Sequence, residues 1–411
     1  MGDPGRVVVV GASVCGAHAA ETLRDEGWEG EIVLVGAEGR LPYDRPPLSK
    51  AVLQAEADAD VDDPTFNPAS AYEEKRIDLE LGRPAVAVDP RARTVTLEGG
   101  RSIRYDHLLL ATGSRVRRLT VPGSDLPGVL YLRTYDDAMR LRAAIAGARR
   151  AVVVGAGFIG SEVASSCRSR GLDVTVLEAL PAPLARALGE EVGGYLGDLH
   201  RSHGVDLRLS TGVTAFRGSG RVEQVVASDG RALDADLVVV GVGIEPEVSY
   251  LAGSGIAVDN GIVVDVQGRT GTPGVFAAGD CANWPHPASG RRLRVEHWEH
   301  AWYHGEAAAR SILGKGEAYD PLLYFWSDQY DVELQYIGHA ARWDRVVVRG
   351  RPSDFSFAAF YLDGGILRAV MTVGRPEEET EAVRELVRAQ ARPNPGALAD
   401  EGTALRDAAG G

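Results

Sequence analysis

Two glycine-rich turns, each directly after a run of valines, constrain what this chain can fold into. The first reads VVVVGASVCG at residues 7–16, and the second reads VVVGAGFIG at residues 152–160. A continuous β-branched run is typical of a buried parallel strand, and the glycines let the chain turn sharply into a helix. The N-terminus of that helix offers backbone N–H groups and a positive dipole to a pyrophosphate. Two such turns in one chain predict two bound dinucleotides and electron transfer between them.

The composition fits a multi-domain globular protein and argues against several classes of partner. The chain has 411 residues, of which 45% are hydrophobic and 25% charged. At roughly 150 residues per domain, this length predicts two or three domains. The net charge of −14 argues against nucleic acid and anionic membranes as partners. The chain starts without a basic n-region and has no apolar run long enough to span a membrane, so we expect a cytoplasmic protein.

Each glycine turn opens a βαβ unit of the size expected for a nucleotide-binding fold. Residues 17–25 have helical composition and 31–35 form the second strand; the corresponding segments of the later unit are 161–169 and 173–177. Further apolar strands are expected at 107–113, 236–243 and 274–280. This order predicts an α/β protein with two Rossmann-like dinucleotide-binding domains, one inserted in the other.

The expected first nucleotide domain is discontinuous, over 1–115 and 242–318, and the second spans 116–241. From about residue 319, alternating stretches such as 345–349 and 355–361 predict antiparallel strands with one solvated face, and 377–390 predicts a helix. These segments form a C-terminal α+β domain over 319–395. The Ala/Gly-rich residues 396–411 are expected to be a flexible tail.

The two turns differ in how well they match the dinucleotide fingerprint. Gly155, Gly157 and Gly160 complete the GxGxxG pattern, and Glu178 stands at the end of the next strand, where an acid hydrogen-bonds a ribose 2′-OH. A carboxylate there repels a 2′-phosphate, so the second turn predicts NADH. The alternative is a glycine turn in a nucleotide-free α/β domain. The first turn has Ser13 in place of the second glycine, and its strand partner ends near Glu38.

Longer motifs resemble those of one enzyme family. PYDRPPLSK at residues 42–50 resembles the hallmark of the FAD-dependent ferredoxin reductases that serve Rieske dioxygenases and bacterial haem-thiolate monooxygenases. YLRT at 131–134, AGDC at 278–281 and FWSDQY at 325–330 are similar to further motifs of these reductases. The similarity runs from about residue 6 to about residue 387. It identifies the chain as a member of the putidaredoxin reductase type within the pyridine nucleotide-disulfide oxidoreductases.

The resemblance implies a glutathione-reductase-like fold and an electron route. Hydride passes from NADH to N5 of FAD, and electrons then leave singly to an iron–sulfur ferredoxin that feeds a monooxygenase or a Rieske dioxygenase. Lys50 is expected beside the flavin, paired with Glu162, because a buried lysine needs a partner. Phe158 is expected to cover the flavin until the nicotinamide displaces it. These three are the expected catalytic residues.

The fingerprints and the resemblance together predict two sets of cofactor-binding residues, and no metal ligand. For FAD these are Gly11, Ser13, Cys15, Gly16, Glu38, Arg45, Lys50, Ala111, Thr112, Gly113, Arg133, Gly279, Asp280 and Trp298. For NAD they are Gly155, Gly157, Phe158, Ile159, Gly160, Glu162, Glu178, Gly243 and Glu296.

Several of these roles have a plain structural alternative. Lys50 is alternatively a surface lysine, Asp280 a turn aspartate and Phe158 a core residue. Trp326 is a candidate for the electron exit toward the ferredoxin or an ordinary core tryptophan. Cys15 is more simply a small buried hydrophobe than a tuned thiol.

Two other functions fit the same fold. A disulfide or peroxide reductase needs a cysteine beside the flavin, yet segment 41–50 contains none, and the three cysteines form no CxxC pair. A flavin-containing signalling protein resembling apoptosis-inducing factor would reduce its flavin slowly and pass no electrons to a ferredoxin.

Docking of a ferredoxin, usually an acidic protein, requires a local basic patch on a chain of net charge −14. If such a patch exists, the rate of ferredoxin reduction should fall as the salt concentration rises. Separately, the chain is expected to act as a monomer or weak dimer. Scattered solvated arginines are the alternative to a patch. The candidates are Arg115, Arg117, Arg118, Arg291, Arg292 and Arg294.

Overall fold

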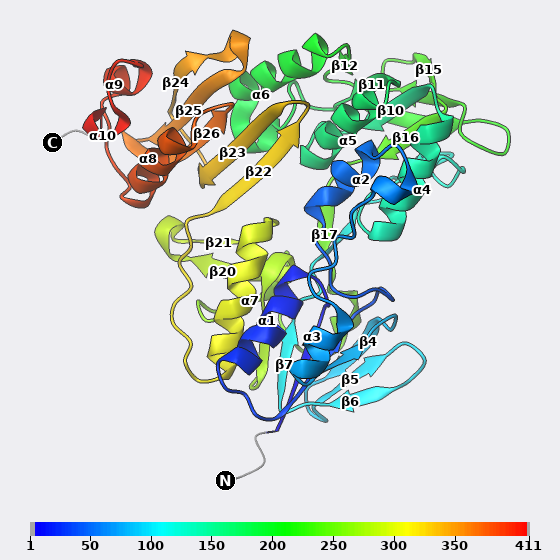
Figure 1. Cartoon of the computed structure of the whole chain (residues 1–411), viewed down its shortest axis with the longest axis vertical. Coiled ribbons are helices and arrows are strands. Elements are labelled where there is room, and N and C mark those ends of the chain that lie inside the picture. Colours follow the sequence, from blue (N-terminus) through cyan, green and yellow to red (C-terminus); the bar gives the residue numbers. More distant parts are fainter. Residues whose placement is uncertain (1–4, 409–411) are drawn as a thin grey trace. The chain divides into compact units, whose positions relative to one another are not determined.

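The computed structural model describes residues 5–408, and these divide into two compact units (Figure 1). The first unit comprises residues 5–44, 63–115 and 244–321, and the second comprises 45–62, 116–243 and 322–408. The expected inserted domain lies within the second unit, together with 45–62 and the C-terminal region. The finer division into three domains stays a prediction. Among residues 5–408, no helix is both long and apolar enough to cross a membrane.

The first unit is built on a five-stranded parallel sheet in the order β19-β7-β1-β2-β3. Its strands are β1 (Arg6–Val10), β2 (Glu31–Val35), β3 (Ile77–Glu80), β7 (His107–Leu110) and β19 (Val275–Ala277). Helices α1 (Val14–Asp25) and α7 (Trp298–Ile312) lie side by side against it (Figure 1). Val7 and Val9 enter the core under these helices, whereas Val8 and Val10 enter the core on the other face. Burial on both faces explains the unbroken valine run.

Smaller elements complete the first unit. They include an antiparallel sheet of β4 (Ala85–Asp89), β5 (Thr94–Leu97) and β6 (Ser102–Arg104), and a second small sheet of β18 (Ile262–Val263), β20 (Ala282–His286) and β21 (Arg291–Leu293). The remaining elements are α3 (Ala69–Glu74), the paired strands β8 (Ser114–Val116) and β17 (Ile244–Pro246), and the 3₁₀ turns η3 (Ser249–Leu251), η4 (Gly279–Cys281) and η5 (Pro287–Ser289).

The second unit repeats the nucleotide-binding pattern. Its parallel sheet has the order β12-β11-β10-β16-β9. The strands are β9 (Val129–Leu130), β10 (Arg150–Val154), β11 (Asp173–Leu177), β12 (Asp206–Arg208) and β16 (Leu237–Val240). The helices are α2 (Ala51–Gln54), α4 (Tyr135–Gly147), α5 (Phe158–Ser169) and α6 (Ala185–Ser202), with 3₁₀ turns η1 (Pro46–Ser49) and η2 (Asp58–Asp60). An antiparallel sheet of β13 (Val213–Arg217), β14 (Gln224–Ala227) and β15 (Ala232–Asp234) follows. Two parallel nucleotide-type sheets in one chain confirm the predicted α/β class.

The C-terminal part of the second unit is a five-stranded antiparallel sheet in the order β22-β23-β26-β25-β24. Its strands are β22 (Tyr324–Gln329), β23 (Val332–Gly338), β24 (Arg345–Arg351), β25 (Ser356–Asp363) and β26 (Ile366–Val373), with η6 (Pro352–Asp354) between β24 and β25. Helices α8 (Glu377–Arg388), α9 (Pro395–Ala399) and α10 (Leu405–Ala408) follow.

The expected solvated face of this sheet is wrong for β25. Phe357 and Tyr361 pack in one core with α6 residues such as Val192, while Phe360 packs in the opposite core with Val383 of α8. Helix α6, which covers one of these two faces, is remote in sequence from β25. Periodicity along one strand therefore could not reveal that both faces are covered.

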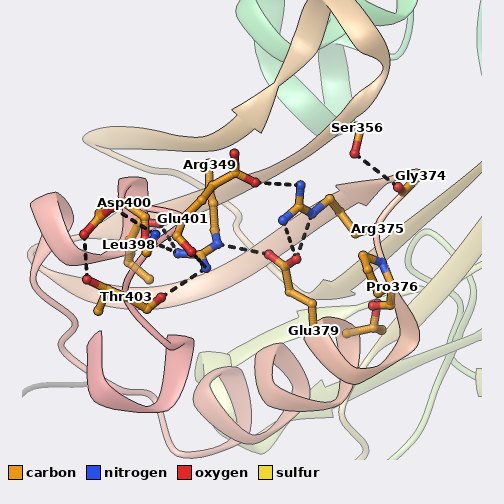
Figure 2. Close-up of polar contacts among 12 residues, drawn as sticks. Arg349, Ser356, Gly374, Arg375, Pro376, Glu379, Leu398, Asp400, Glu401 and Thr403 are labelled. Carbon is orange, nitrogen blue, oxygen red and sulfur yellow. Dashed lines mark hydrogen bonds and ion pairs between the residues drawn. The ribbon is translucent and has the colours of Figure 1, made fainter.

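The expected loose tail is also wrong for residues 396–408, whereas 409–411 lie outside the described residues. Leu398 and Leu405 are buried against the sheet domain. The guanidinium of Arg349, on β24, donates to the carbonyl oxygens of Leu398 (3.2 Å), Asp400 (2.7 Å) and Thr403 (3.1 Å), as Figure 2 shows. Hydrogen bonds from a buried side chain to the backbone satisfy carbonyls that a short helix leaves open.

Candidate functional site

The first glycine turn connects β1 to α1 and leaves no room for side chains at two glycines. Gly11 has φ +121°, and a Cβ there would lie 2.1 Å from Ala111 O. At Gly16 a Cβ would lie 1.8 Å from Gly11 O. The helix therefore begins in direct contact with the turn, with its N-terminal N–H groups at the end of the sheet.

The second turn, between β10 and α5, repeats this geometry. Gly155 has φ +98°, and a Cβ would lie 2.4 Å from Gly241 O; at Gly160 a Cβ would lie 2.0 Å from Gly155 O. At Gly157, by contrast, a Cβ would meet nothing within 4 Å, and its φ is −78°. The space above this residue is thus open to a ligand. The exposed side chain of Ile159, at 44%, lies in the same turn.

Gly157 explains why the first turn tolerates Ser13. Both residues are helix N-caps, and neither makes a side-chain capping bond. Ser13 has φ −118°, a conformation open to any residue. The serine therefore imposes no backbone strain on the turn. The helix N-terminus after each turn presents backbone N–H groups of the kind that bind a pyrophosphate, and at the second turn the Gly157 position is open.

Cys15 packs on the backbone beneath the first turn. A Cβ at Gly279 would lie 3.1 Å from Cys15 Sγ, and a Cβ at Gly305 would lie 2.4 Å from Cys15 O. Burial raises the pKa of the Cys15 thiol well above its usual range. A neutral thiol is a poor nucleophile. The structure therefore favours the small buried hydrophobe, and Cys167 and Cys281 are buried free thiols as well.

The other residues expected at the first turn follow neighbouring strand ends. Gly113 (φ +65°) and Gly279 (φ +72°) turn the chain after β7 and β19. Thr112 Oγ1 donates to Glu247 O at 2.7 Å, and Glu38 Oε2 accepts from the Tyr43 hydroxyl at 2.6 Å. Asp280 lies in η4, next to Gly279. Strand ends of one parallel sheet meet at one edge, which is where such folds bind ligands.

Sequence reasoning missed a buried histidine that supports this edge. The N–H of Gly279 donates to His304 Nδ1 at 3.2 Å, so this ring nitrogen is an acceptor. Burial lowers the pKa of His304 to about 3. The ring of His300 lies 4.8 Å from that of His304, and burial lowers the pKa of His300 too. Helical spacing on α7 was the available signal, because positions 300 and 304 share one face.

We expect acid to destabilise the protein through these histidines. In the unfolded chain a histidine takes up a proton near pH 6.5, whereas folded His304 stays neutral down to about pH 3, so its contribution is present above pH 6.5 and falls as pH drops. By pH 5 the loss is about 2 kcal/mol for this histidine. Urea unfolding at pH 7 and pH 5 measures the slope. His304→Gln should flatten it, whereas Tyr319→Phe in the same cluster should not; equal slopes in wild type and H304Q would contradict the assignment.

Trp298 and Glu296 also belong to the first unit. Trp298 Nε1 donates to Asp44 Oδ1 at 2.7 Å, and Trp298 stacks with Trp302. Glu296 forms an ion pair with Arg294 at 2.6 Å. Their assignments to FAD and NAD respectively stay predictions.

Glu178 ends β11 and is fixed by two backbone N–H groups. Its Oε2 accepts from the N–H of Ala156, inside the second fingerprint, at 2.6 Å, and its Oε1 accepts from the N–H of Leu180 at 2.8 Å. The carboxylate is thus held directly at the glycine turn. Gly243 has φ +99° and follows β16 of the same sheet.

Lys50 and Glu162 meet in the second unit. Lys50 Nζ lies 3.0 Å from Glu162 Oε1, and the two side chains are only 17% and 4% exposed. This arrangement excludes the surface-lysine alternative. Glu162 also accepts from the hydroxyls of Ser49 and Ser327, two residues that sequence reasoning missed. The signal for Ser327 was its place in the FWSDQY motif, from which only Trp326 was singled out.

Three further expected residues lie in the second unit. The Phe158 and Phe325 rings pack edge to face, 4.5 Å apart, so Phe158 has a packing role whatever else it does. The Arg45 guanidinium donates to the carbonyl of Arg133, which joins two of the residues expected to bind FAD. Arg133 precedes Thr134, the N-cap of α4.

The candidate docking arginines are partly engaged within the chain. Arg115 pairs with Glu245 (2.8 Å) and lies 3.6 Å from Glu247, and Arg294 is largely buried against Glu296. Arg118 stacks over Tyr131. Neighbouring carboxylates neutralise the charges of Arg115 and Arg294. These contacts therefore favour the alternative that these two arginines do not belong to a basic docking patch.

Comparison with known proteins connects this geometry to a family. The pattern of the pyridine nucleotide-disulphide oxidoreductases matches residues 5–305, and that of the reductase C-terminal domain matches residues 324–409. The chain belongs to the pyridine nucleotide-disulphide oxidoreductase family. Membership implies FAD and NAD(H) as cofactors, which agrees with two turns that each fit a pyrophosphate.

Within this family, the similarity to ferredoxin reductases extends over nearly the whole chain. Rhodocoxin reductase of Rhodococcus erythropolis is 42% identical over 92% of this chain and 88% of its own. The ferredoxin–NAD(+) reductase subunit of the Pseudomonas putida benzene 1,2-dioxygenase system is 39% identical, over 98% and 97%. The ferredoxin reductase for the CYP199A2 system from Rhodopseudomonas palustris has a TM-score of 0.94 at 37% identity, over 98% and 100%. These relatives confirm the resemblance found in the motifs.

Proposed function

We propose that this oxidoreductase is an NADH-dependent ferredoxin reductase. The observation that carries the proposal is that one chain combines two dinucleotide-type turns with a C-terminal reductase domain. This combination extends over nearly the whole length of a known ferredoxin reductase. The putidaredoxin reductase–putidaredoxin complex, at TM-score 0.93 and 35% identity over 98% of this chain and 97% of that one, supports an iron–sulfur protein as electron acceptor. The acceptor would in turn feed a monooxygenase or a Rieske dioxygenase.

We assign one cofactor to each of the two turns. The first turn would hold FAD through the N-terminus of α1, with Glu38 for the ribose and Asp280 for the ribityl or phosphate side. The second would bind NADH exchangeably through the N-terminus of α5. When bound, FAD would accept two electrons as a hydride and release them one at a time. Lys50, held by Glu162, is the cation assigned to the flavin. We further propose that the protein acts in the cytoplasm as a monomer or weak dimer.

Buried thiols argue against the disulfide or peroxide reductase. Such enzymes require a reactive cysteine. Burial instead raises the pKa of the Cys15 and Cys281 thiols, and it raises the pKa of Cys167 to about 12. Thiol titration after NADH reduction should therefore find no extra pair of electron equivalents.

The test is electron transfer from NADH through the purified holoenzyme to cytochrome c, with and without ferredoxins carrying [2Fe–2S], [3Fe–4S] or [4Fe–4S] clusters. We expect turnover to depend on at least one ferredoxin and to slow with ionic strength if a basic patch steers it. Turnover that is equally fast without any ferredoxin would remove the proposed partner. Slow flavin reduction and no transfer to any ferredoxin would favour the alternative that resembles apoptosis-inducing factor.

Glu178 should set the preference for NADH. Its carboxylate is fixed at the turn by the Ala156 and Leu180 N–H groups, so it would hold a negative charge close to a 2′-phosphate. Replacing Glu178 with glutamine should shift the ratio of kcat/KM for NADH and NADPH by about tenfold toward NADPH, on the order of 1.4 kcal/mol. The exposed Glu190→Gln is the matched control. A preference of the wild-type enzyme for NADPH over NADH would contradict this role of Glu178.

A further inference from the structure

The carboxylate of Glu162 is surrounded by three donors from two distant parts of the second unit, the adjacent Ser49 and Lys50 and the C-terminal Ser327. Oε2 accepts from the Ser49 hydroxyl, whereas Oε1 accepts from both Lys50 Nζ (3.0 Å) and the Ser327 hydroxyl (2.7 Å). Ser49 and Ser327, like Glu162, are almost wholly buried. Oε1 is therefore shared by the lysine assigned to the flavin and by a serine of the C-terminal sheet.

The direction of the Ser327 hydrogen bond is set by a further residue. Gln329 Nε2 donates to Ser327 Oγ at 3.3 Å, and Gln329 is completely buried. Because Ser327 Oγ accepts from the amide, its own hydrogen is available to Glu162 Oε1. The chain of donation thus runs from Gln329 through Ser327 to Glu162.

The strand β22 directs these residues toward α5. Phe325, Ser327 and Gln329 alternate with more exposed positions and share one face of the strand. On that face, Phe325 contacts Phe158, and Ser327 contacts Glu162. One strand of the reductase C-terminal domain therefore touches two of the residues assigned to the hydride step.

We propose that Ser327 is a positioning residue for the Lys50–Glu162 ion pair. Its hydroxyl occupies one side of Glu162 Oε1 and leaves the other side to the ammonium. Without that hydroxyl, Oε1 would lose a donor and the carboxylate could rotate, so Lys50 Nζ would be drawn toward its second acceptor, Pro46 O, 3.4 Å away. This inference rests on the proposed function, since Lys50 is assigned to the flavin there.

The experiment is anaerobic stopped-flow reduction of the FAD-loaded protein by NADH, which separates the limiting rate from the Kd of NADH. Ser327→Ala should lower the limiting rate about tenfold, the effect of one hydrogen bond to a charged group, with less than about a twofold change in Kd. Ser327→Thr keeps the hydroxyl and should restore the rate. Ser327→Cys keeps the volume of the side chain but is a weaker donor, so it should give an intermediate rate. This variant serves as the test if S327A loses FAD or stability.

Ser165→Ala is the matched control. Ser165 is equally buried, lies on the same helix as Glu162, and accepts from the N–H of Tyr330 in the β22–β23 hairpin at 2.7 Å. The donors to Glu162 described above are Ser49, Lys50 and Ser327, not Ser165. S165A should keep the limiting rate within about twofold of wild type, because it loosens the same hairpin contact without touching the ion pair.

A double-mutant cycle with Glu162→Gln decides whether Ser327 acts through Glu162. If it does, S327A should add less than about a twofold loss to E162Q. An undiminished tenfold loss in the E162Q background, or equal rates in S327A and S165A, would overturn the proposal. Failure of wild-type FAD to be reduced by NADH would instead overturn the proposed function.

Discussion

Replacing Arg349 with methionine is expected to lower the free energy of unfolding by about 3–5 kcal/mol. The side chain is only 8% exposed and lies 3.2 Å from Glu379. Methionine would leave the carbonyls of Leu398, Asp400 and Thr403 without their buried donor (Figure 2). Removing one partner of a buried polar network costs the desolvation of every group that stays unpaired.

Arg351→Met is the control for this prediction. Arg351 lies two residues further along β24, is 77% exposed, and pairs with Asp354 at 3.0 Å. Exposed pairs contribute about 0–1 kcal/mol, so R351M should unfold near the wild-type urea midpoint. Proteolysis of residues 395–408 gives a second readout, because R349M should release this segment first. Indistinguishable midpoints and cleavage rates in the two variants would show that Arg349 does not hold the C-terminal helices.

Replacing Gly16 with alanine is expected to abolish FAD binding and to destabilise the first unit by about 3 kcal/mol. The added Cβ would lie 1.8 Å from Gly11 O, a backbone atom, and 3.1 Å from Val9 Cγ1. No rotamer change relieves a clash with backbone, so α1 must move away from β1. That movement displaces the helix N-terminus proposed to hold the pyrophosphate.

The flavin content of purified G16A and its thermal midpoint measure both effects. Gly39→Ala is the control in the same unit, because a Cβ at Gly39 would meet nothing within 4 Å. G39A should bind FAD as wild type does. A G16A protein with full flavin content would mean that the first turn does not require its close helix contact.

Local patterns predicted the strands and helices around both turns because steric rules act over a few residues. The run of four valines implied burial on both faces of β1, and the glycine spacing implied contact between turn and helix. The same reasoning was wrong for β25, because its second covering layer comes from α6, far away in sequence. It was wrong for 396–408, because a side chain on β24 holds that segment.

The candidate site shows the same division. Glu178 could be placed at the second turn from its spacing alone, and the structure puts its carboxylate on the N–H of Ala156. For His304 the only signal was its helical spacing from His300, which packing residues show as well. Its acceptor role for Gly279 follows only from the contact between α7 and the end of β19.

The sequence by itself determined that this chain has two dinucleotide-type turns, that the second of them completes the GxGxxG fingerprint, and that segment 41–50 contains no cysteine. These features depend on residues close together along the chain. Only the tertiary structure decided that Glu162 shares its carboxylate among Ser49, Lys50 and Ser327. Glu162 and Ser327 are 165 positions apart, and only the packing of β22 on α5 makes them neighbours.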